Sequence, residues 1–345
     1  MLQLRNRQSN TEFNLILKKI LISVITALLL SAPSFSLNNE WGFEIEPYCG
    51  VRNALLNEYV YGKNSQTGEE YHLSLLNWNL KNQVYAGFNA DVRFLAFHLE
   101  GNFKGFLQNN SGTMDDSDWM QDAGYKTGNT SIKTNYSEHE LNFIQGFNVD
   151  AKALYDFKPA KGLTLSPSIA FSYETYTLTA NNGTTYYGYG KNGVKCSYFS
   201  YDDTAHRTVT QMSGEVIKLE RYDYYTWFGF DIKYTTPDNM WKFGISAEIS
   251  PWAYIFSRDS HVAKSVYYID IGQGFFSAYR ASAFIQFNLN QHCGIKFLAD
   301  GMITGELKGN DYTSSSYNGT FKNNGPVSGS ATRYFDFQLS AVVSF

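Results

Sequence analysis

The stretch from Leu141 to Phe157 reads Leu-Asn-Phe-Ile-Gln-Gly-Phe-Asn-Val-Asp-Ala-Lys-Ala-Leu-Tyr-Asp-Phe, so apolar and polar residues alternate along most of it. Because successive side chains of a strand point to opposite faces, a period of two predicts a β-strand with one apolar and one polar face. Runs of the same kind begin near Trp41, Trp78, Leu95, Leu163, Tyr222, Phe243, Ala281, Cys293 and Arg333. The sequence therefore predicts about ten strands.

The length of these runs and the composition of the chain indicate which face is buried. Strands of a soluble sandwich usually have about five or six residues, and many of these runs are longer than about ten. Aromatic residues make up 17% of the chain, with 26 Tyr and 26 Phe, which suits the aromatic girdles of a membrane barrel. We expect an all-β fold, a transmembrane antiparallel up-and-down β-barrel of about ten strands with its apolar side chains facing lipid.

Short and long connections alternate along the chain. Short ones lie near residues 91–94, 158–162, 235–240 and 290–292, and long polar ones near residues 62–70, 108–136, 181–215 and 306–329. This alternation is typical of outer-membrane barrels, which have short periplasmic turns and long external loops.

The two ends of the chain indicate export to the outer membrane. Basic residues up to Lys19 precede an apolar run at residues 20–30, and the small residues Ser34 and Ser36 follow, which predicts a secretory signal peptide at residues 1–36. Residues 37–345 form the expected barrel domain. The final alternating stretch ends in Phe345 and resembles the C-terminal signal of bacterial outer-membrane barrels.

Composition argues against several other classes. No later stretch approaches the roughly 20 apolar residues of a spanning helix, and a net charge of -4 gives no basic surface for nucleic acid. The three cysteines, Cys49, Cys196 and Cys293, have neither metal-ligand nor disulfide-framework spacing. We expect a monomer in contact with outer-membrane lipid, with no metal, no cofactor and no nucleic-acid partner.

Two short motifs carry candidate chemistry. Asp116 and Asp118 are two residues apart, so both carboxylates project from one face of an extended backbone. Asp259 and His261 repeat this spacing with an imidazole in the second place, which pairs an orienting acid with a candidate general base. On a ten-strand layout the pairs fall just past the outer ends of the third and seventh strands, facing each other across the barrel mouth. Each motif alone is common in solvated turns.

Together the motifs resemble the omptin family of outer-membrane proteases. The similarity is strongest in Met114-Asp-Asp-Ser-Asp-Trp-Met120 and in Asp259-Ser-His261, and it extends to strand order over the mature chain. It implies an aspartyl-type endopeptidase on the cell surface that cleaves peptide bonds of proteins or peptides with an activated water. In this assignment Asp116, Asp118, Asp259 and His261 are catalytic.

The resemblance also implies a substrate-binding site, in which this chain departs from the family. Glu58 matches an acid that helps to bind the basic side chain before the cleaved bond, and Met114 and Ser257 belong to the same expected site. The family's second acid would fall at position 257, where this chain has serine followed by Arg258, so we expect a weaker preference for basic residues.

The family's lipopolysaccharide site lies on strand five. The matching stretch, Phe171–Thr175, lacks the acid and base in register, although Glu174 is one residue away. We therefore expect activity to depend less on lipopolysaccharide than the resemblance implies, and lipopolysaccharide or another outer-membrane lipid is the one cofactor that the sequence leaves open.

Two points remain open from the sequence. A catalytically silent barrel acting as an adhesin or surface antigen is the alternative function, although such a barrel has no chemical need for all four motif residues. In addition, the lipid-facing parity that begins at Phe243 puts residues 259 and 261 on the outside, so a bulge is required, and Pro251 is a candidate position for it. We expect His98 to be a packed or hydrated lumen residue, and His139 has no partner evident from sequence.

Overall fold

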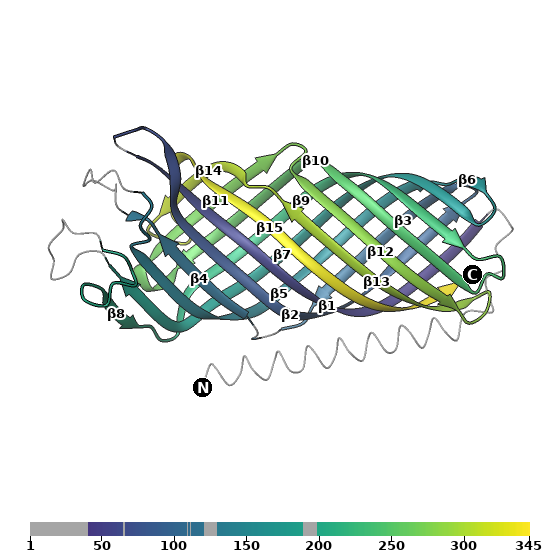
Figure 1. Ribbon diagram of the computed structural model, residues 1–345, viewed down its shortest axis with the longest axis horizontal. Coiled ribbons are helices and arrows are strands. Elements are labelled where there is room, and N and C mark those ends of the chain that lie inside the picture. The colour runs from purple at the N-terminus through teal and green to yellow at the C-terminus, as the bar shows by residue number, and fades with distance from the viewer. Residues whose placement is uncertain (1–40, 65, 109, 111, 121–129, 189–198) are drawn as a thin grey trace.

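The computed structural model describes residues 41–345 except 65, 109, 111, 121–129 and 189–198. Figure 1 shows that they form a β-barrel whose strands are tilted relative to its long axis. The predicted signal peptide and Cys196 lie outside the described residues, and Cys49 and Cys293 are free thiols. The strands are β1 (Trp41–Lys63), β2 (Glu70–Phe94), β3 (Phe97–Phe106), β4 (Gly112–Asp118), β5 (Asn135–Tyr155), β6 (Phe157–Ala160), β7 (Leu163–Tyr187), β8 (Thr208–Gln211), β9 (Glu215–Thr235), β10 (Trp241–His261), β11 (Val266–Gly274), β12 (Ala278–Asn288), β13 (Cys293–Thr304), β14 (Leu307–Ser314) and β15 (Lys322–Ser344).

All strand pairings are antiparallel, and β1 pairs with β15 to close the ring. Three barrel strands are each interrupted once and so consist of two segments: β3 with β4, β11 with β12, and β13 with β14. With β1, β2, β5, β7, β9, β10 and β15 they form the ring of about ten strands that the sequence predicts. No helix among the described residues is long and apolar enough to cross a membrane.

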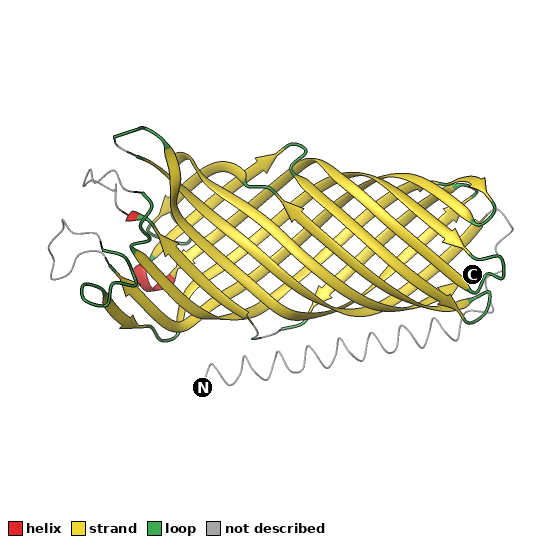
Figure 2. Ribbon diagram, viewed as in Figure 1, coloured by secondary structure: helices red, strands yellow, loops and turns green. Residues whose placement is uncertain are grey.

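The two ends of the barrel differ. At one end, here called the turn end, consecutive strands are joined tightly, and the C-terminus lies there (Figures 1 and 2). At the other, the loop end, strands extend well into the stretches that the sequence predicted as loops. Residues 108–136 contain β4, residues 181–215 contain β8, and residues 306–329 contain β14. Pairing continues there because polar side chains on the outer face suit a strand in water as well as a loop.

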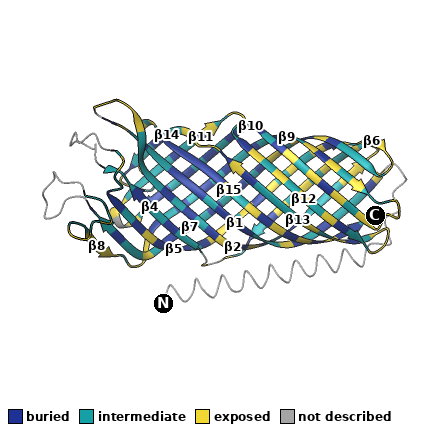
Figure 3. Cartoon of the chain, in the orientation of Figure 1, coloured by how far each residue is buried: buried dark blue, intermediate teal, exposed yellow. Residues whose placement is uncertain are grey.

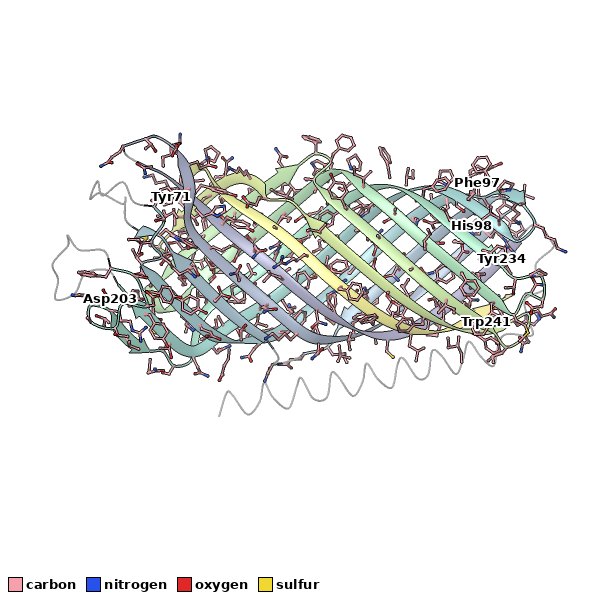
Figure 4. All side chains as sticks on the ribbon, in the orientation of Figure 1. Tyr71, Phe97, His98, Asp203, Tyr234 and Trp241 are labelled. Atoms are coloured by element: carbon pink, nitrogen blue, oxygen red, sulfur yellow. The ribbon has the colours of Figure 1, made fainter. Side chains whose placement is uncertain are left out.

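An apolar belt surrounds the half of the barrel nearer the turn end, where Figure 3 shows most of the exposed residues. The border of the belt at the turn end includes Phe97, Tyr234 and Trp241, which Figure 4 places there. At the border nearer the loop end, Tyr224 lies between Tyr173 and Tyr254. Its ring centroid is 4.9 Å from that of Tyr173 and 5.9 Å from that of Tyr254. Along β7 the belt therefore runs from residue 163 to residue 173, close to the 9–11 residues of a membrane-crossing strand. The predicted outward-facing apolar surface is confirmed for this half only.

Beyond the belt, toward the loop end, the apolar side chains turn inward. They fill the lumen with a cluster that contains Leu56, Leu76, Trp78, Leu80, Tyr85, Phe106, Met114, Leu141, Phe143, Tyr176, Leu178, Ala180, Val216, Ile217 and Leu219. The sequence interpretation was wrong for Trp78, Leu80, Leu141 and Phe143, which it assigned to the lipid face. The outer surface at this level is polar because water, rather than lipid, surrounds it.

β-bulges produce this reversal in three strands. The pairing register shifts in β2 near Asn82, in β5 near Ile144 and in β10 between Ile249 and Trp252. One extra residue moves every later side chain to the other face of the sheet. Ile245 is therefore 57% exposed, whereas Ile255, ten residues later and on the same parity, is fully buried. The bulge predicted near Pro251 is confirmed.

Inside the belt, the lumen holds paired charges. Arg52 bridges Glu174 and Asp336 at 2.6 and 2.7 Å. Arg280 contacts Glu248 and Asp150. Closer to the turn end, His98 lies between Asp91 and Asp156 at 3.0 Å from each, so it is the packed lumen residue that the sequence predicts.

Candidate active site

The two predicted pairs come from strands on different sides of the loop-end mouth. Asp116 and Asp118 lie on β4, hydrogen-bonded between β2 and β5, and Asp259 and His261 lie at the end of β10, between β9 and β11. All four lie within strands and not just past strand ends, because both strands continue beyond the apolar belt. The bulge in β10 directs Asp259 inward, where it is 5% exposed.

The structure brings three of these residues to one cavity. It has a volume of about 210 Å³, and Asp116, Asp118 and His261 all line it. Asp259 lies behind His261, whose Nε2 is 2.8 Å from the Asp259 Oδ2. Because a carboxylate only accepts hydrogen bonds, Nε2 carries the proton in neutral imidazole and Nδ1 remains the free basic nitrogen. The geometry is that of a base held by an acid, facing two further carboxyl groups.

Burial and neighbouring charges shift the pKa values of Asp116 and His261. The site lies beyond the apolar belt, outside the membrane-crossing part of the strands. Burial and the neighbouring charge of Asp118 raise the pKa of Asp116 to about 8, so this carboxyl group holds a proton near neutral pH. Burial opposes the charged form of His261, but the charge and hydrogen bond of Asp259 outweigh it and raise the pKa of His261 above its ordinary value.

Among the other residues that line the same cavity, three with chemically useful side chains were missed from sequence. His139 is buried on β5, with Nε2 2.9 Å from the Ser137 Oγ and Nδ1 against the carbonyl of Asn182. Their Ser-x-His spacing on a strand was the available signal, since it repeats the Asp-x-His pattern. The third residue is Lys264, exposed in the short 3₁₀ turn η4 (Val262–Lys264) directly after His261.

The predicted substrate-binding residues lie on the inner face. Glu58 is 4% exposed and accepts a 2.8 Å hydrogen bond from the Trp78 indole. Met114 is fully buried in the apolar cluster, and Ser257 is fully buried on β10. Arg258 points to the outer face, with its guanidinium 4.5 Å from the centroid of the Tyr317 ring. The expectation that Arg258 opposes a basic substrate side chain was therefore wrong, because its charge lies on the other side of the sheet.

Glu174, the acid nearest to the expected lipid site, also faces the lumen. It is 3% exposed and contacts Arg52 and Tyr176. It is therefore not placed to contact a lipid outside the barrel.

Among the described residues, no group of three or more His, Cys, Asp or Glu side chains is arranged to hold a metal ion.

Comparison with known proteins shows the family and the fold of the chain. A model of the Omptin family matches residues 42–324. The outer-membrane protease OmpT from Escherichia coli superimposes with a TM-score of 0.75 at 15% identity, over 90% of this chain and 99% of that one. The outer-membrane protein OprG from Pseudomonas aeruginosa matches far less well, with a TM-score of 0.36 at 6% identity over 88% of this chain and 95% of that one. Curated protein sequences give no match.

Proposed function

The chain belongs to the omptin family of outer-membrane proteases, and from this premise we propose that it is an active endopeptidase whose site faces the cell exterior. The observation that carries the proposal is the shared cavity of Asp116, Asp118 and His261, with Asp259 bonded to the imidazole behind it. The alternation of tight turns and long loops supports the orientation, since outer-membrane barrels place their long loops outside.

In the proposed mechanism, a water molecule in the cavity attacks the carbonyl carbon of the substrate. His261 accepts a proton from this water through its free ring nitrogen, and Asp259 orients the ring and stabilises the imidazolium that forms. General-base assistance of this kind contributes roughly 10²- to 10⁴-fold in rate.

The acidic pair supplies the second half of the chemistry. Because the raised pKa of Asp116 keeps a proton on the pair near neutral pH, Asp116 acts as a donor to the developing oxyanion or the leaving amine. Asp118 remains available to hold the water. This division follows the rule that two neighbouring carboxyl groups do not both ionise readily.

The test is cleavage of a randomised peptide library by refolded protein, with cleavage sites mapped by mass spectrometry. We expect His261→Ala and Asp116→Asn each to lower kcat/KM by about 10²- to 10⁴-fold. Asp115→Asn is the matched control, because Asp115 lies beside the pair but on the outer face, bonded to Asn77. Equal cleavage by wild type and His261→Ala contradicts the mechanism.

Activity also depends on pH through the base. Since His261 must be neutral to accept a proton, kcat/KM falls on acidification, and the raised pKa of His261 places this limb above pH ~6.5. A flat profile from pH 5 to 8 contradicts the assignment of His261 as the base.

A catalytically silent adhesin is the alternative, and it predicts no cleavage from any variant.

The dependence of activity on lipopolysaccharide is a separate question. The inward orientation of Glu174 supports activity without this lipid. We propose that cleavage in pure detergent micelles stays within a few-fold of that with lipopolysaccharide added, and an absolute requirement for the lipid refutes this.

A further inference from the structure

A row of polar side chains crosses four strands below the candidate dyad. Asp311 on β14 lies opposite Asp270 on β11, Asp270 lies opposite Ser257 on β10, and Ser257 lies opposite Arg221 on β9. All four side chains are buried and face the lumen. Position 257, where the family resemblance led us to expect an acid, thus has an aspartate as its direct neighbour on the next strand.

Glu58 brings a further carboxyl group to this row from β1. The charge of Glu58 is the strongest that acts on Asp270, ahead of those of Asp311 and Asp259. Arg221, a cation whose charge acts on Glu58, is engaged by Asp223 at 2.8 Å. The acidic row, defined here as Glu58, Asp270 and Asp311, therefore has more acidic groups than free cations beside it.

Several polar atoms around the acidic row have no partner. Within the described part of the chain, the Glu58 Oε1, the Asp270 Oδ1 and the hydroxyls of Ser257 and Ser330 are buried without a hydrogen bond. Ser330 lies directly opposite Glu58 across β1 and β15. A buried polar group without a partner costs roughly 1–3 kcal/mol, and more when it is charged, so this arrangement is suited to a cationic ligand with several donors.

We propose that Asp270, backed by Asp311, supplies with Glu58 the carboxylates that bind a basic substrate side chain, and that the acidic function expected at position 257 has moved to the neighbouring strand. This inference rests on the proposed protease function and deepens it. The preferred side chain is arginine, because a planar guanidinium has five donors and can contact two carboxylates and a hydroxyl together. Lysine, with three donors at one point, binds less well.

The assignment changes the expected specificity. The weaker basic preference predicted from Ser257 required that no other acid replace the missing one, and Asp270 replaces it. Burial and the charge of Asp259 raise the pKa of Glu58 to about 7. Preference for arginine over glutamine therefore increases as pH rises through neutrality.

The first experiment measures kcat/KM for two matched peptides that differ only by Arg or Gln before the cleaved bond. We expect Asp270→Asn to lower the Arg-to-Gln ratio by about ten- to a hundredfold. Asp115→Asn, the same change on the outer face, leaves the ratio unchanged. An unchanged ratio in Asp270→Asn overturns the proposal.

A second experiment moves the carboxylate from position 270 to position 257. It tests whether the effect of Asp270→Asn comes from the lost carboxylate or from a change in structure. In the double variant Ser257→Asp, Asp270→Ser the carboxylate returns to the position expected from the family. We expect this variant to recover at least tenfold of the ratio lost in Asp270→Asn, because residues 257 and 270 are direct cross-strand neighbours. Failure of a folded double variant to recover the ratio counts against a shared pocket.

A binding measurement separates this proposal from the protease function. In the His261→Ala variant, the arginine peptide should bind at least tenfold more tightly than the glutamine peptide, and adding Asp270→Asn should remove the difference. If wild type cleaves no peptide but this difference is present, the protease function fails and the pocket stands. If cleavage occurs without any difference in binding or ratio, the pocket fails and the protease function stands.

Discussion

Two layers of buried charge lie one above the other in this barrel, and they differ in how completely they are paired. In the layer inside the apolar belt, Arg52 contacts Glu174 and Asp336, and Lys104 also contacts Asp336. In the layer at the mouth, Glu58 and Asp270 each keep a buried oxygen without a partner. The difference lies in the placement of cations.

This difference separates stability from function. In the layer inside the belt, the ion pairs of Arg52 join β1 to β7 and β15, so they hold the wall of the barrel together. An acidic layer without enough cations costs folding free energy, and the binding of a cationic substrate recovers it. Sites that bind and react commonly have such perturbed groups.

The largest effect should come from removing a cation from the paired layer. Arg52→Met leaves Glu174 and Asp336 buried without their main partner and also removes the contact with the Tyr334 ring, 3.7 Å from the guanidinium. We expect the free energy of unfolding to fall by about 3–5 kcal/mol, measured by urea unfolding in detergent micelles. Arg333→Met is the control, since Arg333 is exposed on the outer face, and its effect should stay within about 0.5 kcal/mol.

The comparison breaks if Arg52→Met is as stable as the control variant. It becomes sharper if Glu174→Gln, added to Arg52→Met, restores part of the lost stability, because Lys104 still contacts Asp336 in Arg52→Met whereas Glu174 has lost its ion pair. The second substitution removes the unpaired charge and not the packing of the side chain.

At the mouth, removing an acid should raise the free energy of unfolding, which is the opposite of the effect of Arg52→Met. Because the pKa of Glu58 is raised to about 7, the folded chain retains a proton that the unfolded chain releases. Stability therefore falls as pH rises from the ordinary glutamate pKa toward 7. Glu58→Gln should leave the free energy of unfolding unchanged at pH 4 and raise it by about 1–3 kcal/mol at pH 8.

The same urea titration checks this at both pH values. Glu215→Gln, at an exposed position at the start of β9, should show no difference between them. A Glu58→Gln variant that is less stable than wild type at pH 8 contradicts the view that the mouth carries excess acid.

The sequence predicts the barrel but not the orientation of each side chain. Period-two alternation identifies the strands, yet it cannot locate the bulges near Asn82 and Ile144, because a bulge is defined by the register of two strands. Only Pro251 gave a local signal. The four catalytic candidates were found because their two-residue spacing is local, whereas Asp270 was missed because its proximity to Ser257 depends on cross-strand pairing.

The smallest effect should come from Lys264, an exposed cation beside the unpaired layer. Its positive charge opposes protonation of His261 and favours ionisation of Asp116. Lys264→Gln should therefore raise the pKa of His261 and move the acidic limb of kcat/KM upward by a few tenths of a pH unit, the order of magnitude expected for one solvent-screened charge. Lys264→Arg keeps the charge and should not move the limb. Because salt screens exposed charges, the shift should disappear near 1 M salt. A shift that persists at that salt concentration would mean that Lys264 acts by contact and not through its field.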